Sequence, residues 1–261
     1  MIRLMRISWI VLGLALLLAL CAPSAGSLPG SSLRVQLAAV PTAQPVNPDP
    51  RVGPIFVDGD TIHICTASVV HSSTGDLILT AAHCLASVLK ARFVPGFART
   101  AAPSNVWTID AVYVDPLWIS SRDPAVDYAF ARVSRPGGGP IEAQTGRGFL
   151  LGTAPAPGTH VEVIGYAAGI GGTPIGCQNS TGLTKGYPTF PCSGMVEGTS
   201  GSPWINGATV NGATGGLQLG GCTPSISYSA PFTQRTAALL ALAEAGGPGQ
   251  AAPFSFFGGC L

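Results

Sequence analysis

Charged side chains are scarce in this sequence of 261 residues. Only 10% of the residues are Asp, Glu, Lys or Arg, with 13 basic and 12 acidic residues in all. Such a balance lacks the basic excess expected of a protein that binds nucleic acid or an anionic membrane. Internal repeats are also absent, which disfavours a repetitive structural protein of the cell surface. The cysteines lack paired Cys-x-x-Cys spacing, so the sequence predicts no metal site.

The sequence has no hydrophobic run long enough for a comfortable membrane span. Its longest apolar stretch, residues 10–20, follows Arg3 and Arg6 and precedes several small residues. This pattern predicts a secretory signal peptide over residues 1–25. An uncleaved membrane anchor is disfavoured by the short length. A lipid anchor on Cys21 is disfavoured because a leucine precedes it, where a small residue is expected.

Glycine and proline are abundant, with 35 and 23 residues, which favours a loop-rich β protein that is exported. Loss of the predicted signal peptide leaves 11 basic and 12 acidic residues. It also leaves six cysteines, an even number that predicts disulfides in an exported chain. These six are Cys65, Cys84, Cys177, Cys192, Cys222 and Cys260.

Organised pattern begins near residue 52. Residues 26–51 are rich in Pro, Ala, Ser and Val, which predicts a poorly ordered linker or a short pro-segment. Residues 233–245 form an Ala- and Leu-rich stretch that predicts a helix, and the tail 248–261 has no assigned role. Short apolar runs separated by turn residues predict strands of a sandwich or barrel. The runs are 65–70, 76–80, 91–94, 107–114, 127–133, 160–166 and 215–219.

A histidine stands in a setting suited to a general base. Residues 80–84 read Thr-Ala-Ala-His-Cys directly after an apolar run, and imidazole exchanges a proton near neutral pH. Further along, residues 198–204 read Gly-Thr-Ser-Gly-Ser-Pro-Trp, which offers a nucleophilic serine. Between the two, Asp127 precedes an apolar Tyr-Ala-Phe run and offers an orienting carboxylate.

These three stretches, in the order His, Asp, Ser, resemble the chymotrypsin-like (trypsin-fold) serine peptidases, and the secreted bacterial members in particular. The order differs from that of subtilisin-like and α/β-hydrolase enzymes. The resemblance implies an all-β fold with two six-stranded antiparallel β-barrels and a C-terminal helix. We expect one peptidase domain over residues 52–247, with halves at about 52–140 and 150–232.

The resemblance also implies a role for each residue of the motifs. Ser200 is the expected nucleophile, His83 the general base and Asp127 the group that orients the imidazole. The backbone N–H groups of Gly198 and Ser200 are the expected oxyanion hole. The mechanism requires no cofactor and no metal. Thr199 stands where animal members carry an aspartate that pairs with a newly freed N-terminus.

Rival residues are few. Asp115 and Asp123 are the alternatives to Asp127, and Ser202 is the alternative nucleophile, which the Gly-x-Ser-Gly spacing disfavours. The remaining histidines lack the motif, so we expect structural or surface roles for them. They are His63, His71 and His160.

The resemblance implies a disulfide between Cys65 and Cys84, which would join the histidine loop to the neighbouring strand. A bridge between Cys177 and Cys192 is favoured for the loop before the nucleophile, leaving Cys222 for Cys260. The alternative joins Cys192 to Cys222 across the expected specificity pocket.

Substrate preference is the least determined property. Gly194 lies six residues before Ser200, where trypsin-like enzymes place an aspartate, so a preference for Lys or Arg is disfavoured. Glu197 either meets a basic substrate group or is a solvated loop charge. Residues 215–222 are the expected strand for pairing with an extended substrate. Leu217, Gln218 and Leu219 are its candidate substrate contacts.

The sequence therefore predicts a monomeric, secreted serine endopeptidase, extracellular or in the cell envelope, that acts on peptides or proteins. One alternative is an esterase or a narrow processing peptidase with the same triad. Another is a catalytically silent member that binds a partner through its cleft. Because Thr199 has no charge, we expect that cleavage near Arg51 and Val52 is not needed to form the oxyanion hole.

Overall fold

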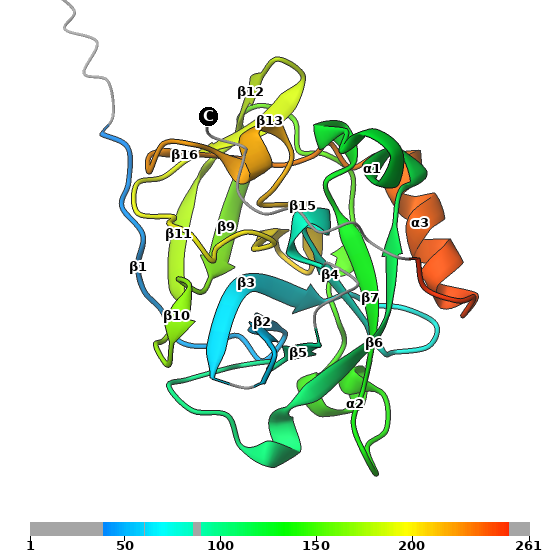
Figure 1. Ribbon diagram of the computed structural model, residues 1–261. Coiled ribbons are helices and arrows are strands. Elements are labelled where there is room, and N and C mark those ends of the chain that lie inside the picture. Colours follow the sequence, from blue (N-terminus) through cyan, green and yellow to red (C-terminus); the bar gives the residue numbers. More distant parts are fainter. Residues whose placement is uncertain (1–38, 60, 86–89, 251–261) are drawn as a thin grey trace, which may run out of the picture. The chain divides into compact units, whose positions relative to one another are not determined.

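The structure is a computed structural model that describes residues 39–59, 61–85 and 90–250. Strands dominate it, and the helices are short (Figure 1). The predicted signal peptide at residues 1–25 lies outside the described residues, as do Cys21, Cys260 and most of the tail. None of the helices in the described part of the chain is long and apolar enough to cross a membrane.

The first half of the domain is a closed barrel of six antiparallel strands. Hydrogen bonding runs in the order β3, β2, β5, β6, β7 and β4, and β4 pairs back with β3 to close the ring. A short strand, β10 (Gly169–Ile170), adds to the free edge of β3. The barrel strands are β2 (Val52–Val57), β3 (Ile62–Val69), β4 (Leu77–Thr80), β5 (Ala91–Phe93), β6 (Trp107–Val114) and β7 (Ala129–Ser134).

Apolar side chains explain why this sheet closes. All four residues of β4 are buried, so its Leu-Ile-Leu run packs on both faces. The register shifts between Ile55 and Phe56 and again between Ile109 and Ala111. Such bulges bend a strand and increase its twist, which lets a small sheet curl into a barrel.

The second half contains two sheets. Six strands follow the order β1, β11, β9, β14, β15 and β8, and three follow the order β12, β13 and β16. The larger sheet has β1 (Gln44–Pro45), β8 (Leu150–Leu151), β9 (His160–Gly165), β11 (Ile175–Ser180), β14 (Pro203–Asn206) and β15 (Thr209–Ala213). The smaller has β12 (Gly182–Thr184), β13 (Tyr187–Pro191) and β16 (Ile226–Tyr228).

Cross-links join these two sheets. A disulfide connects Cys177 of β11 to Cys192, which follows β13. Beside it, Asn179 Nδ2 donates to the carbonyl oxygen of Pro191 over 2.7 Å. Directly after β15, Thr214 bridges to Ser229, which follows β16, and the N–H of Gly215 donates to the carbonyl oxygen of Tyr228 at 2.9 Å. In the second half, side chains thus supply part of the connection between the sheets.

A C-terminal helix packs on the first half. α3 (Gln234–Glu244) begins at Thr233, whose side chain forms a capping box with Thr236. The helix contacts β6 and β7, and Arg132 donates to the carbonyl oxygen of Ala243 in its last turn. The all-β class, with a closed antiparallel six-stranded barrel and this helix, is confirmed. The remaining helices are α1 (Pro116–Ser121), α2 (Ile141–Thr145), η1 (Ala82–Cys84), η2 (Pro103–Asn105), η3 (Pro124–Val126) and η4 (Leu217–Gly220).

Residues 39–51 differ from the expected poorly ordered linker. β1 pairs with β11, and Ser193 exchanges backbone hydrogen bonds with Pro41 and Ala43 over 2.7 and 2.8 Å. Further along, Arg51 forms an ion pair with Asp49 and lies over the ring of Phe149, 3.7 Å from its centroid. Backbone N–H and C=O groups of the second half thus hold this segment, which a composition rich in proline does not reveal.

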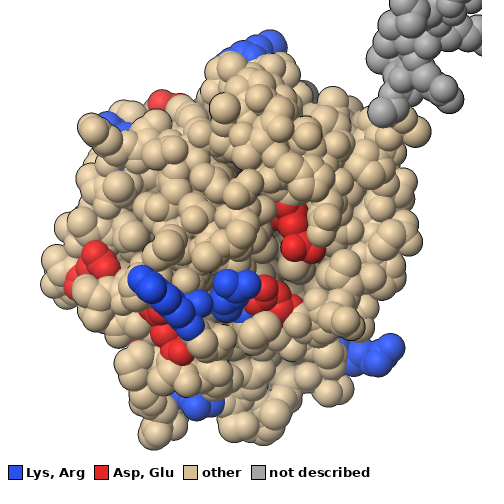
Figure 2. Space-filling view, turned by 180° about the vertical axis from the view of Figure 1, so that it is seen from behind, with Lys and Arg blue, Asp and Glu red and all other residues tan. Residues whose placement is uncertain are grey.

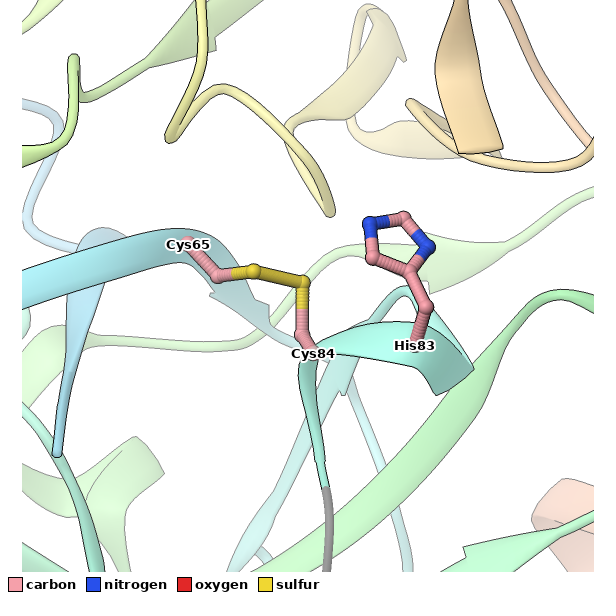
Figure 3. A group of neighbouring side chains, drawn as sticks. All are labelled: Cys65, His83 and Cys84. Carbon is pink, nitrogen blue, oxygen red and sulfur yellow. A yellow bond between two sulfur atoms is a disulfide. The ribbon is translucent and has the colours of Figure 1, made fainter. Parts of the chain in front are cut away.

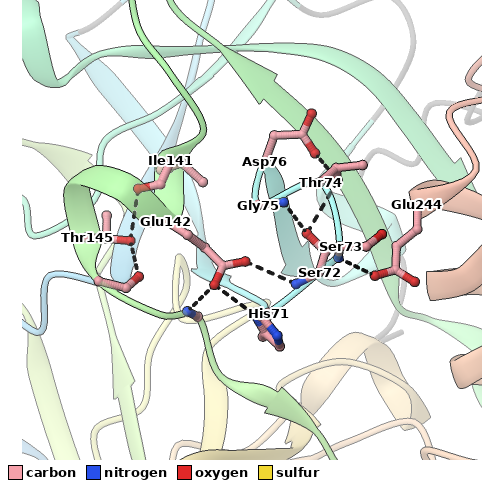
Figure 4. A network of polar contacts seen from close by, with 12 residues as sticks. His71, Ser72, Ser73, Thr74, Gly75, Asp76, Ile141, Glu142, Thr145 and Glu244 are labelled. Atoms are coloured by element: carbon pink, nitrogen blue, oxygen red, sulfur yellow. Dashed lines mark hydrogen bonds and ion pairs between the residues drawn. The ribbon is translucent and has the colours of Figure 1, made fainter.

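Two carboxylates fix the loop between β3 and β4 (Figure 4). Glu142 accepts hydrogen bonds from His71 Nδ1 and from the N–H groups of Ser72 and Gly148, at 2.9 to 3.0 Å. Glu244 of α3 accepts a hydrogen bond from the backbone N–H of Ser73 at 2.6 Å. Burial opposes ionisation of Glu142, but these hydrogen bonds outweigh it and hold the pKa of its carboxyl below the usual range. The loop that leads into β4 is therefore anchored from both sides.

Candidate active site

His83 lies in η1, the short helix that directly follows β4. The following residue, Cys84, forms a disulfide with Cys65 of β3, so the histidine turn is joined covalently to the neighbouring strand (Figure 3). The sulfur atoms and a ring nitrogen of His83 lie within 4.8 Å of one another. Because the two sulfurs are bonded to each other, they are not thiolate ligands for a metal.

Asp127 orients the imidazole. Its side chain is fully buried and accepts hydrogen bonds from His83 Nδ1 at 2.8 Å and from the backbone N–H of His83 at 3.0 Å. A third donor is the N–H of Gly216 at 2.8 Å. The carboxylate therefore assigns the ring proton to Nδ1 and leaves the lone pair of Nε2 free to act as a base.

The two rival carboxylates have structural roles. Asp115 accepts from the N–H of Leu117 at the start of α1 and also pairs with Arg235. Asp123 accepts from the N–H of Ala125 at the start of η3. Both are helix N-caps, whereas Asp127 alone of the three contacts His83.

The nucleophile loop packs against the histidine turn. Gly201, directly after Ser200, has φ +80°, and a Cβ there would lie 2.1 Å from the carbonyl oxygen of Thr66 and 3.1 Å from the nitrogen of Ala81. Only glycine allows this approach, which places Ser200 beside the turn that carries His83. Ser202 is fully buried, and its Oγ has no hydrogen-bond partner in the described part of the chain, so it is unsuited to attack a substrate.

Ser200 Oγ and His83 Nε2 form no hydrogen bond among the described residues. Such contacts are often long in unliganded sites and shorten when substrate binds. The structure thus pairs the imidazole of His83 with the carboxylate of Asp127 and shows no hydrogen bond from Ser200 to that ring among the described residues.

In the nucleophile loop, the backbone N–H groups of Gly198 and Ser200 have no hydrogen-bond acceptor among the described residues. The N–H between them, of Thr199, turns inward to the carbonyl oxygen of Val196 at 3.1 Å. The Thr199 hydroxyl donates to the same oxygen at 2.7 Å. The loop therefore presents two unpaired donors side by side.

The expected substrate strand is wrong for residues 217–219. These residues form η4, and Gln218 and Leu219 have φ of 54° and 52°, in the left-handed region. The preceding N–H, of Gly216, turns to Asp127 instead of to an open strand edge. Four glycines within residues 215–221 let the chain turn here, which an expectation based on apolar content does not capture.

Gly194 and Glu197 lie in the segment that precedes the nucleophile. The N–H of Gly194 donates to the carbonyl oxygen of Pro224, and a Cβ at this glycine would contact Thr42 and Ala43. Glu197 is exposed, and its carbonyl oxygen accepts from the N–H of Ala168 at 2.8 Å. The pairing of Cys222 with Cys260 involves a residue outside the described part of the chain.

Thr66 was missed by the sequence reasoning. It is fully buried, directly after Cys65 in β3, and hydrogen-bonds to both Gly198 and Ser200. The sequence marks Thr66 only by its position after Cys65. That position does not distinguish a contact with the nucleophile loop from ordinary packing within a strand.

The described geometry has counterparts among known proteins. Residues 65–211 match the protein family described as trypsin-like peptidase domain. No curated protein sequence is detectably similar to the chain. The solved structures that share the fold include three that are each under 25% identical to this chain, so they show the fold alone.

The first structure is the protease Anisep from Arthrobacter nicotinovorans, with 23% identity and a TM-score of 0.68 over 78% of this chain and 100% of that one. The second is a thermostable serine protease, AL20, from an extremophilic microorganism, with 22% identity and a TM-score of 0.65 over 76% and 99%. Human heparin-binding protein has 15% identity and a TM-score of 0.63 over 81% and 100%.

Proposed function

The chain belongs to the trypsin-like peptidase family, and from this premise we propose that it is a secreted serine endopeptidase with Ser200 as nucleophile. His83 is the general base and Asp127 orients it, and the N–H groups of Gly198 and Ser200 form the oxyanion hole. One observation carries the proposal. A fully buried carboxylate holds His83 Nδ1 at 2.8 Å and leaves Nε2 free beside a loop with two unpaired backbone donors.

The residues in these roles perform the reaction in two steps. Ser200 Oγ attacks the scissile carbonyl carbon while its proton passes to His83 Nε2, and the negative carbonyl oxygen is held by the two N–H groups. The C–N bond then breaks, and His83 gives the proton to the leaving amine. Water attacks the resulting ester by the same route, which releases the acid and restores Ser200.

Asp127 stabilises the charged imidazolium during both steps. Three donors hold its two oxygens in a site without solvent contact. Removal of the carboxylate would leave His83 free to adopt the tautomer that has its proton on Nε2, which is the wrong one for a base.

The nucleophile loop supports the expectation that no charged N-terminus is needed. The position of the animal aspartate is filled by Thr199, which is 2% exposed and bonds within its own loop through both its hydroxyl and its N–H. A chain beginning at Val52 also lacks β1 and the hydrogen bonds to Ser193. We therefore expect a chain that begins at residue 25 to hydrolyse esters, and a chain that begins at Val52 to be impaired. Activity of the Val52 form alone would reject this.

Secretion is part of the proposal. The two disulfides within the described residues, Cys65–Cys84 and Cys177–Cys192, are typical of proteins that fold in an oxidising compartment. Peptides or proteins are the substrate class that the family implies. Residues 193–196 carry no acidic side chain, which favours a substrate other than one with Lys or Arg at the cleavage site.

A purely binding role receives less support. Human heparin-binding protein shows that this fold also serves a protein named for binding a polyanion. A polyanion requires clustered cations. In the face drawn in Figure 2, basic and acidic side chains are few and interspersed.

A fluorophosphonate probe tests the proposed function, because it forms a covalent bond only with an activated serine. We expect labelling of the processed protein that Ser200→Ala abolishes and that the matched variant Ser202→Ala retains. A folded, processed sample that takes up no probe would refute the endopeptidase. Hydrolysis of small esters without cleavage of any peptide in a library would favour the esterase instead.

A further inference from the structure

Thr66 connects the closed barrel to the nucleophile loop. It lies in β3, next to Cys65, and is completely buried. Its backbone N–H donates to the carbonyl oxygen of Ser200 at 2.8 Å, and its own carbonyl oxygen accepts from Thr80 Oγ1 at 2.7 Å. Its backbone is therefore fixed by β4 on one side and by Ser200 on the other.

The Thr66 hydroxyl is fully used as well. It donates to the carbonyl oxygen of Gly198 at 3.0 Å and accepts from the N–H of Tyr166 at 2.9 Å. One side chain in the first half thus joins two segments of the second half. Both segments border the two unpaired N–H groups.

Hydrogen bonds to carbonyl oxygens decide where the neighbouring N–H groups point, because the C=O and N–H of a trans peptide point in opposite directions. The peptide of Glu197 and Gly198 is fixed by Ala168, and that of Thr199 and Ser200 by the N–H of Ser202 at 3.0 Å. Thr66 holds the carbonyl oxygens of the other two peptides, which lie between and directly after the peptides that carry the unpaired N–H groups and therefore set how those two are placed relative to each other. The Thr66 hydroxyl holds the peptide after Gly198, and the Thr66 N–H holds the peptide after Ser200.

Gly198 makes the hydroxyl contact important. Its φ is +93°, and a Cβ would lie 2.1 Å from the nitrogen of Ala168, so no other residue fits. Glycine also has the widest choice of backbone conformations. Without the hydroxyl, the Gly198 oxygen and the Tyr166 N–H would both lose their partner in a buried site. The peptide after Gly198 would then be held only through the bond from the Thr199 N–H to Val196.

We propose that Thr66 is a positioning residue for the oxyanion hole, with its hydroxyl setting the orientation of Gly198. It does not touch the substrate and acts through the loop. This inference rests on the proposed function of Ser200. It assigns a chemical task to a residue of the histidine-bearing half that the triad does not include.

Kinetics of Thr66→Val test the inference, because valine keeps the shape and removes the hydroxyl. Loss of one oxyanion donor lowers kcat by roughly 10²- to 10³-fold. For a misoriented donor we expect a fall of about 10- to 100-fold, with KM changed by less than about threefold, since the hole acts mainly in the transition state. Thr66→Ser retains the hydroxyl and is expected to keep kcat within about threefold of the unmodified protein.

Ser68→Ala is the matched control. Ser68 lies on the same strand and is equally buried, but its hydroxyl has no partner among the described residues. We expect it to leave kcat unchanged. A second pair, Thr66→Ser and Thr66→Ala, compares two shortened side chains with and without the hydroxyl, which keeps the test informative if valine prevents folding.

Affinity for a peptide aldehyde supplies a readout that a purely structural role would not move, since the aldehyde forms a tetrahedral adduct with its oxygen in the hole. We expect it to weaken in Thr66→Val and Thr66→Ala in proportion to kcat/KM. Equal kcat and aldehyde affinity in folded variants with and without the hydroxyl would overturn the inference. An unmodified protein without fluorophosphonate labelling would instead refute the proposed function.

Discussion

The two halves of the domain are closed in different ways. In the first, backbone hydrogen bonds run through six strands and return from β4 to β3. In the second, a disulfide, two side-chain hydrogen bonds and a short backbone contact of residues 214–215 with residues 228–229 connect two sheets. The continuous ladder carries His83 and Asp127, whereas the cross-linked half carries Ser200.

This difference assigns different tasks to the halves. Acid–base chemistry needs an imidazole with one fixed tautomer, and a closed barrel with a buried carboxylate supplies it. The nucleophile loop has positive-φ glycines, and Thr66 of the other half holds part of it. The proposed catalytic geometry of the second half therefore includes a contact supplied by the first.

Substitution in each half should show whether the two act as one catalytic unit. We expect His83→Ala and Ser200→Ala each to lower kcat by about 10⁴- to 10⁶-fold, because neither proton transfer nor attack works alone. The double variant should be no slower than the worse single variant. Steady-state kinetics on a peptide ester measure this. Losses that multiply in the double variant would mean that the halves contribute independently.

Removal of each disulfide compares the two kinds of closure. The bridges span 19 residues in the first half and 15 in the second, and each is expected to contribute about 3 kcal/mol to the free energy of unfolding. Without Cys177–Cys192, amides of β11 and β13 should exchange faster with solvent. Without Cys65–Cys84, β3 and β4 should stay protected because their ladder remains.

Hydrogen exchange followed by mass spectrometry, with double Cys→Ala variants, measures this contrast. Circular dichroism at matched temperatures controls for global unfolding. Equal loss of protection around both bridges would contradict the difference in closure.

Glu142 should stabilise the first half in a pH-dependent way. Its carboxyl has a pKa below the ordinary 4.5, so its contribution is present above that pH and is lost as the pH falls through the lower folded value. We expect Glu142→Gln to lower the free energy of unfolding by about 1–2 kcal/mol at pH 7, and by less once the pH is well below 4.5. Urea titrations at both pH values give the comparison.

Glu162 on β9 of the second half is the matched control, since its carboxylate has no hydrogen bond or ion pair among the described residues. Glu162→Gln should change stability by less than about 0.5 kcal/mol. An equal effect of the two substitutions would show that the hydrogen bonds of Glu142 add no stability to the first half.

His63 lies at a contact between the halves, and we expect its substitution to have the smallest effect on the free energy of unfolding. It is 2% exposed, its Nε2 bonds to the carbonyl oxygen of Gly171 at 2.8 Å, and burial lowers the pKa of the imidazole below 6.5. The unfolded chain binds a proton that the folded chain excludes, so stability should fall as the pH drops below 6.5, by at most about 1.4 kcal/mol per pH unit. His63→Phe should flatten this slope, and His160→Phe, at an exposed position, should not.

Thermal unfolding between pH 5 and pH 7.5 measures the slope. The aromatic rings of Phe56, Phe97 and Tyr166 surround His63 edge-on, so phenylalanine has a suitable environment. An unchanged slope in His63→Phe would assign the acid sensitivity to other groups.

The sequence was most informative where residue type and chemistry coincide. The His, Asp and Ser motifs predicted the family, and apolar runs predicted β4, β6, β7 and β9 close to where they occur. The pairing of Cys65 with Cys84 followed from the resemblance. In each case a local pattern carries the physical requirement, such as a buried strand that leads into a polar turn.

The sequence failed where distant backbone groups decide the conformation. The proline-rich residues 39–51 are held by β11 and Ser193. Residues 217–219 turn because glycines permit it and because Asp127 takes the N–H of Gly216. None of these contacts leaves a periodic trace in residue type.

The rate at which a protease cleaves the peptide bond between Arg51 and Val52 can report how often the barrel opens. Val52 is fully buried at the start of β2, and the Arg51 carbonyl oxygen accepts from the N–H of Val69 at 2.7 Å. A protease that cuts after arginine therefore finds this bond only in molecules whose first strands have separated. When such a protease is in excess, the rate at which a fragment beginning at Val52 accumulates reports how often the barrel opens.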